Sequence, residues 1–302
     1  MKTEKRKKRS WNLLRVLGPG LTTGAADDDP SGIATYSQTG AQFGYQQLWT
    51  ALYMLPFMMA VQEACARIGL VKGKGLAAII KDHYSKRILY FMVTIMVVAN
   101  TINIGADIGA MATAAQLLIP IPFAVLTLMF TVIILVLEIY TKYTTYSKIL
   151  KWLALSLLAY PITVFIVEQP WNTLFLASLI PKFEFSFPFL FIIVGVFGTT
   201  ISPYMFFWQT SQEVEEEKIR KQSSPTSFKS LSKHIRVMRI DNTAGMIISE
   251  FTTWSILVVT ASALHSKGIT DIKTAADAAK ALEPLVNTFP YAGLLAKLIF
   301  SI

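Results

Sequence analysis

The sequence predicts an all-α polytopic membrane protein, and three observations support this prediction. Of the 302 residues, 53% are hydrophobic and only 16% are charged, whereas a soluble domain carries about a quarter charged residues. The mean hydropathy is +0.47. The apolar residues come in blocks of about 20, the length that crosses the ~30 Å hydrocarbon core of a bilayer. The chain is therefore expected to be embedded in a lipid bilayer, which is its first expected partner.

Eight membrane spans are expected in residues 14–302, behind a basic segment at residues 1–13. The first and sixth spans are predicted to be broken, and the eighth is only partial. The predicted bounds are 14–40, 46–68, 88–118, 122–141, 148–168, 187–212, 243–265 and 291–302. Between the spans we expect a short amphipathic helix in residues 73–87, a charged helix and then a mobile Ser-rich segment in residues 212–236, and a surface helix in residues 268–285.

The distribution of basic residues predicts the topology, because cytoplasmic loops of membrane proteins are rich in Lys and Arg. If the N-terminus is cytoplasmic, 23 of the 28 Lys and Arg residues fall in the N-terminal segment or in the loops after spans 2, 4 and 6. The net charge of +9 therefore indicates orientation in a plasma or inner cell membrane, and it argues against nucleic acid as a partner.

Two of the spans contain helix-breaking motifs. Span 1 contains "DPSG" (residues 29–32), and span 6 contains "GTTISP" (residues 198–203). Proline removes a backbone donor and glycine permits unusual dihedral angles, so each motif is expected to unwind its helix near mid-span. Unwound backbone in a bilayer must be covered by protein or water. Interrupted helices five spans apart indicate a transporter's midplane site within inverted five-span repeats, of which the first is complete here and the second truncated.

A row of three carboxylates, Asp27, Asp28 and Asp29, precedes the first break. A carboxylate at this depth costs at least ~2.5 kcal/mol, and a bound cation offsets that cost. Successive helical side chains lie about 100° apart, so the three cannot all face one ion. Asp29, beside the break, is the expected ligand. Asp27 and Asp28 are expected to be protonated, hydrogen-bonded to other spans, or exposed to a water-filled vestibule.

The ion itself is expected to be a hard one. Neither break contains Cys or His, and the side chains near them offer hydroxyl and carboxylate oxygens, together with backbone carbonyls. Such oxygen ligands favour Mg²⁺, Ca²⁺ or Mn²⁺, whereas sulfur ligands favour later transition metals.

These motifs resemble the NRAMP family of divalent-metal transporters. The resemblance extends to "VQEACARIGLVKGKGLAAII" (residues 61–80), and more loosely to "NTINIGADIGAMATAAQLL" (residues 100–118) and to span 7 from "RIDN" (residues 239–242). It covers essentially the whole chain. It implies the LeuT fold, a metal site between spans 1 and 6, transport by alternating access, and no enzymatic activity.

The chain departs from the metal-transporting members of that family at the site itself. Their span 1 has Asp-Pro-Gly-Asn, so the aspartate is kept as Asp29 whereas the asparagine ligand becomes Gly32. Their span 6 has Met-Pro-His, where this chain has Ser202 and Tyr204. The pattern is similar to the NRAMP-related magnesium transporters, a branch that moves hydrated Mg²⁺ without proton coupling. The resemblance therefore implies Mg²⁺, with Mn²⁺ as a second substrate, no cofactor and no obligatory protein partner.

The expected metal site consists of Asp29 as the charged ligand, Gly32 leaving space for water, the carbonyl of Thr199 and the hydroxyl of Ser202. For the intramembrane acids Asp107 and Glu250, proton relay, orientation of neighbouring groups and helix packing all remain open. The residues expected in the cavity or around the ligands are Asp28, Ser31, Asn103, Asp107, Thr200, Tyr204, Gln209 and Glu250.

Three alternative functions remain open. One is a proton-coupled Mn²⁺/Fe²⁺ transporter of the NRAMP type. Another is a sodium- or proton-coupled amino-acid carrier of the same fold, which Asp29 disfavours because such a carrier must bind the carboxylate of its substrate. The third is a non-transporting metal-binding fragment or sensor, which the incomplete second repeat favours.

Overall fold

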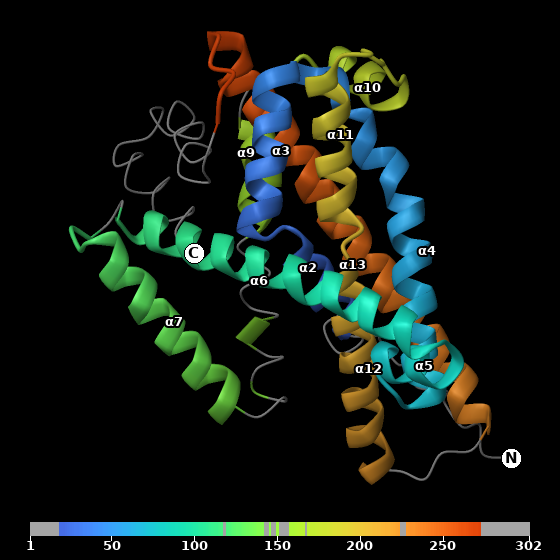
Figure 1. The fold of residues 1–302 in the computed structure, drawn as a ribbon. Helices are drawn as coiled ribbons and strands as arrows, with labels where there is room; N and C mark the ends of the chain where they lie inside the picture. The colour runs from blue at the N-terminus through green and yellow to red at the C-terminus, as the bar shows by residue number, and fades with distance from the viewer. Residues whose placement is uncertain are drawn as a thin grey trace, which may run out of the picture.

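Every secondary-structure element of the described residues is a helix in the computed structural model (Figure 1). The structure describes residues 18–116, 119–141, 145, 149–150, 157–166, 168–223 and 228–272. The α-helices are α2 (Pro19–Asp27), α3 (Pro30–Phe43), α4 (Trp49–Lys72), α5 (Leu76–His83), α6 (Lys86–Gln116), α7 (Phe123–Tyr140), α9 (Ala159–Ile166), α10 (Trp171–Leu179), α11 (Phe187–Thr200), α12 (Pro203–Ser223) and α13 (Phe228–Ala263). The 3-10 helices η1 (Gly44–Gln47) and η3 (His265–Lys267) follow α3 and α13.

The first predicted break lies between α2 and α3. α2 ends at Asp27, and Asp29 adopts an extended backbone (φ −68°, ψ 169°) as the N-cap of α3. Its carboxylate accepts a hydrogen bond from the backbone N–H of Gly32, and Pro30 takes the first helical position, where a missing N–H costs nothing. The local sequence thus ends one half-helix and starts the next, and the predicted discontinuity of span 1 is confirmed.

The second predicted break lies between α11 and α12. Ile201 follows the last residue of α11 with φ −111° and ψ 58°, and Pro203 begins α12. A proline cannot donate to the preceding turn, so the helical hydrogen bonds stop before it and start again after it. The predicted discontinuity of span 6 is also confirmed.

Five helical segments of the described residues are long and apolar enough to cross a membrane, namely Trp49–Lys72, Lys86–Gln116, Phe123–Tyr140, Phe187–Ile219 and Leu231–Lys267. They lie where spans 2, 3, 4, 6 and 7 are expected. α5 occupies the place of the expected amphipathic helix, and α9 falls within the expected fifth span. The expected eighth span and most of the helix at residues 268–285 lie outside the described residues, and residues 268–272 are not helical.

The predicted Ser-rich loop before span 7 is wrong in part, because α13 begins at Phe228 and not near residue 243. Leu231, Ile235 and Met238 of this extension pack in one cluster with Ala66 and Leu70 of α4. Their spacing of four and three places them on one helix face. The helix extends because this face is buried, while Lys, Ser and Arg residues between the apolar positions obscure the stripe in the sequence.

α13 is the central helix of the bundle. It packs against α2, α3, α4 and α9, and Figure 1 shows it passing between α2, α4 and α11. In the largest buried cluster, Tyr36, Met54 and Val196 pack with Ile256 and Leu257 of α13. Figure 1 shows α6 running across the bundle, steeply inclined to α4 and α11, and α7 lying apart from the bundle; both helices leave most of their apolar side chains exposed.

α2 and α13 meet at a glycine seam formed by Gly20 and Gly24 on α2 and Gly245 on α13. A Cβ atom on Gly20 would lie 2.6 Å from the backbone nitrogen of Asn242. Cβ atoms on Gly24 or Gly245 would overlap the backbone of the opposite helix. Small residues permit this close approach of backbones in membrane helices, so the seam fixes where α2 lies on α13.

Asp241 of α13 closes the seam at the start of α2. Its buried carboxylate accepts hydrogen bonds from the backbone N–H groups of Gly18 (2.6 Å) and Gly20 (2.7 Å), and a longer one from Leu21 (3.3 Å). The first N–H groups of a helix have no partner within it, and a negative charge there is favourable. α2 is therefore held to α13 from its first residue.

Candidate metal centre

Asp29 lies where α3, α6 and α12 meet. Its Oδ1 accepts a hydrogen bond from the Gly32 backbone N–H (2.7 Å) and lies 2.7 Å from the hydroxyl oxygen of Ser31, whose one hydrogen serves either this oxygen or Asn103 Oδ1. Its Oδ2 accepts hydrogen bonds from the Asn103 amide (2.8 Å) and the Tyr204 hydroxyl (3.1 Å). Because Asp29 caps α3, its charge also faces the positive end of that helix. The carboxylate is thus surrounded by neutral donors, which a cation can replace.

α6 contributes a polar pair to this group, Asn103 and Asp107, which lie one helical turn apart. Asn103 Nδ2 lies 2.8 Å from Asp29 Oδ2 and 3.2 Å from Asp107 Oδ2. Asn103 Oδ1 lies 2.6 Å from the hydroxyl of Ser31. The structure therefore brings together six of the expected residues, Asp29, Ser31, Gly32, Asn103, Asp107 and Tyr204.

The other expected residues of span 6 have different partners. Thr199 and Thr200, at the end of α11, lie 3.3 Å and 3.0 Å from the hydroxyl of Tyr36 on α3. These contacts join the two half-helices α3 and α11. The hydroxyl of Ser202 is buried and has no hydrogen-bond partner among the described residues. The roles of Thr199 and Ser202 as metal ligands stay predictions.

Gly32 does not leave the open space expected for water. A Cβ atom at this position would lie 2.9 Å from the carbonyl oxygen of Asp27 and 3.4 Å from Asp29 Oδ1. The missing side chain instead lets the backbone of the break come close. A carbonyl oxygen and a carboxylate oxygen thereby lie on the same side of Gly32, and both are ligands that hard cations use.

Asp27 and Asp28 face α13 and not the group around Asp29. Asp27 Oδ2 accepts a hydrogen bond from the Ser249 hydroxyl (3.1 Å), and Asp28 Oδ1 accepts one from the Thr253 hydroxyl (3.0 Å). Glu250 is buried on the same helix, and neither of its carboxylate oxygens has a hydrogen-bond partner among the described residues. The geometry therefore separates Asp28 and Glu250 from the group around Asp29.

No three Asp, Glu, His or Cys side chains among the described residues are grouped so that they could hold a metal ion. An ion at Asp29 would therefore find at most one further acidic side chain and would complete its shell with neutral oxygens or water. This arrangement differs from a structural metal site, in which protein ligands close the shell, and it suits an ion that enters and leaves.

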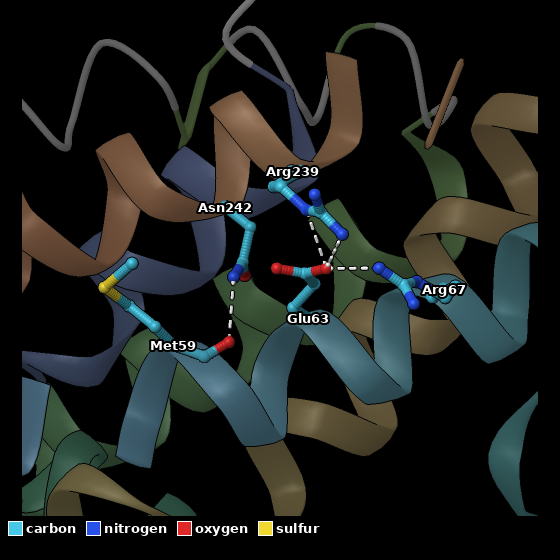
Figure 2. Close-up of polar contacts among 5 residues, drawn as sticks. All are labelled: Met59, Glu63, Arg67, Arg239 and Asn242. Carbon is cyan, nitrogen blue, oxygen red and sulfur yellow. Dashed lines mark hydrogen bonds and ion pairs between the residues drawn. The ribbon is translucent and has the colours of Figure 1, made fainter. Parts of the chain in front are cut away.

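Gln209 belongs to a second polar group, away from the break. Its amide donates a hydrogen bond to Asn242 Oδ1 (3.0 Å), and Asn242 Nδ2 donates one to the carbonyl of Met59 on α4 (3.3 Å). Figure 2 shows the contact between Asn242 and Met59. Gln209 thus links α12 to α13 and does not contact Asp29 directly.

An ion-pair group beside Asn242 was not predicted from the sequence. Glu63 of α4 pairs with Arg67 of the same helix (2.5 Å) and with Arg239 of α13 (2.8 Å), as Figure 2 shows. The available signal was the stretch "RIDN", which contains Arg239. Since Glu63 and Arg239 are 176 positions apart, their pairing follows from the fold and not from local pattern, unlike the i,i+4 pair of Glu63 and Arg67.

A family profile described as "Nramp: Natural resistance-associated macrophage protein-like" matches residues 20–302. The chain belongs to the Nramp family. A similar curated Nramp protein is the divalent metal cation transporter MntH of Ralstonia nicotianae (strain ATCC BAA-1114 / GMI1000). It is 26% identical over 285 residues, which cover 91% of this chain and 62% of the relative. The chain thus spans less than two thirds of that relative's length.

Solved structures of the manganese transporter of Eremococcus coleocola have the same fold at 19% identity. A mutant of that transporter gives a TM-score of 0.77 and covers 100% of this chain and 63% of its own. Its complex with an aromatic bis-isothiourea substituted compound gives a TM-score of 0.75 with the same coverage. The Nramp fold confirms the expected LeuT-type architecture, and these relatives are named as transporters and not as enzymes.

Proposed function

We propose that the protein transports divalent metal cations across the cell membrane by alternating access, with hydrated Mg²⁺ preferred and Mn²⁺ as a second substrate, and without proton coupling. The observation that carries this proposal is the donor set around Asp29. Ser31 and Tyr204 place hydroxyl oxygens, and Asn103 places an amide group, within hydrogen-bond distance of the Asp29 carboxylate. Oxygen ligands of this kind suit Mg²⁺ and Mn²⁺.

The small number of charged ligands favours a hydrated ion. Mg²⁺ sheds its water reluctantly, and proteins usually hold it through one or two carboxylates while several waters remain. Hydroxyl and amide groups such as those of Tyr204 and Asn103 can bond to ion-bound water nearly as well as to protein. Ser202 and Tyr204 stand where the family resemblance places Met and His. The span 6 motif therefore contains no sulfur ligand for a softer ion.

The same replacement supports transport without protons. Histidine is the side chain whose ordinary pKa lies close to neutral pH, and Tyr204 takes its expected place beside Asp29. We expect the internal pH of vesicles to stay constant during Mg²⁺ uptake, as reported by an enclosed pH-sensitive dye. Acidification on metal entry would support the proton-coupled Mn²⁺/Fe²⁺ alternative.

Uptake into vesicles containing the purified protein tests the proposal directly. Asp29→Asn keeps the shape of the side chain and removes its charge, so we expect Mg²⁺ uptake to fall by about 100-fold. Asp82→Asn is the matched control, because Asp82 is an exposed aspartate on α5 that pairs with Lys74. Unchanged uptake by Asp29→Asn, with Asp82→Asn also active, would remove Asp29 from the site and the proposed mechanism with it.

A further inference from the structure

Asn103 stands between two carboxylates of the candidate metal centre. Its amide nitrogen lies 2.8 Å from Asp29 Oδ2 and 3.2 Å from Asp107 Oδ2. One NH₂ group therefore serves both carboxylates with its two hydrogens. A point between two carboxylate oxygens is also where a divalent cation gains most from their charge, so the NH₂ group of Asn103 occupies the place that suits an ion.

We propose that Asn103 supplies the amide oxygen ligand that span 1 lacks at Gly32, that Asp107 is the second carboxylate of the site, and that the NH₂ group of Asn103 takes the place of the ion when no ion is bound. This inference rests on the proposed transport of divalent cations. It assigns to α6 a part of the ion shell that the motifs of spans 1 and 6 do not contain.

The chemistry of the amide allows both states. The carbonyl and NH₂ ends of an asparagine side chain exchange places by a half-turn about its last bond, a torsion with a broad energy profile. Without an ion, the NH₂ end must face the carboxylates of Asp29 and Asp107, because a carboxylate accepts and does not donate. With an ion between them, an oxygen must face the ion, and the half-turn turns Oδ1 toward it once the amide has moved back to make room for the ion.

The hydrogen bonds to Ser31 balance in both states. Without an ion, Asn103 Oδ1 accepts from the Ser31 hydroxyl at 2.6 Å. After the half-turn, the NH₂ end donates to Ser31 Oγ, and the Ser31 hydroxyl donates to Asp29 Oδ1, which lies 2.7 Å away. The Asn103 amide and the Ser31 hydroxyl therefore keep partners in both states, provided that the ion replaces the two bonds from the NH₂ group to Asp29 and Asp107.

The site that results has two carboxylates and one amide oxygen as protein ligands, and water completes the shell of the ion. This composition lies within the one or two carboxylates that Mg²⁺ sites use. The Asn103 amide would also give this chain an amide ligand although span 1 lacks the asparagine, because α6 contributes it.

Equilibrium binding of Mg²⁺ and Mn²⁺ to the purified full chain, by titration calorimetry, tests this assignment. Asn103→Ala should weaken Mg²⁺ binding by about tenfold or more. The matched controls are Asn100→Ala and Asn100→Asp, because Asn100 lies on the same helix and its side chain makes no hydrogen bond among the described residues. Both controls should bind as the wild type does.

Asn103→Asp separates a ligand from a residue that only positions Asp29. As a ligand, the new carboxylate keeps an oxygen, so Mg²⁺ should bind at least as tightly as to the wild type. Three carboxylates would then repel one another when no ion is bound, so the unfolding temperature should fall without Mg²⁺ and rise more on its addition than in the wild type. A positioning residue that must donate to Asp29 would instead lose binding.

The outcomes are distinct. Suppose that the wild type binds Mg²⁺. If Asn103→Ala then binds Mg²⁺ as tightly as Asn100→Ala, or if Asn103→Asp loses Mg²⁺ binding as Asn103→Ala does, the assignment of Asn103 as a ligand is overturned and the proposed function stands. If the wild type binds neither ion, the proposed function and this assignment are overturned together.

Discussion

Replacing Asp241 by Asn should loosen the start of α2 from α13. The Asp241 carboxylate accepts two short hydrogen bonds, from the N–H groups of Gly18 and Gly20, in a buried setting. A hydrogen bond to a charged group contributes about 1.5–3 kcal/mol, and a negative charge at a helix N-terminus contributes about 0.3–1 kcal/mol. Asn keeps one acceptor but turns an NH₂ group toward a backbone donor. One bond and the charge are lost, so we expect a cost of about 2–4 kcal/mol.

Hydrogen exchange followed by mass spectrometry measures this cost locally. In the protein embedded in lipid nanodiscs, amides of residues 18–28 should exchange about 30-fold faster or more, because 2 kcal/mol corresponds to that factor in an opening equilibrium. Asp82→Asn, which removes an exposed aspartate from α5, should leave their exchange unchanged. If Asp241→Asn is folded and its residues 18–28 exchange within twofold of the wild type, the anchoring of α2 by Asp241 is refuted.

Three further predictions concern the glycine seam, the ion selectivity and α5. Gly245→Ala should lower the unfolding temperature, because overpacking costs about 1–3 kcal/mol. Gly105→Ala is the control and should not lower it, because the added Cβ would have nothing within 4 Å. Equal unfolding temperatures of the two variants would contradict the close packing at the glycine seam. Ser202→Met should shift competitive binding toward Mn²⁺, because a thioether favours softer ions; an unchanged ratio of Mg²⁺ to Mn²⁺ affinity would count against this account. The hydrogen bond from Lys74 and its charge lower the pKa of the Asp82 carboxyl, so an NMR titration of Asp82 should give a midpoint below the usual aspartate value. The stabilisation from this pair is complete above the unfolded pKa and is lost as the pH falls through the folded pKa; a midpoint at or above the usual value would show that the pair does not form.

Local chemistry explains which features of the fold the sequence predicts. Asp29 and Pro30 form a cap and a first helical turn among neighbouring residues, so the break in span 1 is visible in a few letters. Asp28 and Asp29 face different neighbours, as expected, but the reason is the break itself, because α2 ends at Asp27 and Asp29 is extended and not helical. Apolar stripes hidden among charged residues, such as the one that extends α13, are predicted less well because tertiary burial decides them.

The sequence predicts that polar residues of α6 lie near the break, whereas the individual contacts around the candidate site follow from long-range packing. Asn103 and Asp29 are 74 positions apart, and nothing in the spacing of α6 shows which turn faces the break. A glycine presents the same difficulty. Gly32 reads as empty space in the sequence, whereas the structure fills that space with the carbonyl of Asp27, because a missing side chain permits close approach of backbone as readily as of water.

The contacts of α2 on α13 also restrict the direction in which α2 can move. Asp241, Gly245, Ser249 and Thr253 follow one another at intervals of four residues, so one ridge of α13 contacts α2 from its first amide to the break. Sliding by one turn, about 5.4 Å, would shift the glycines out of register and force side chains into the opposite backbone. Tilting away from the ridge requires only that a few hydrogen bonds open. α2 can therefore move away from α13 by tilting, and not by translation along it.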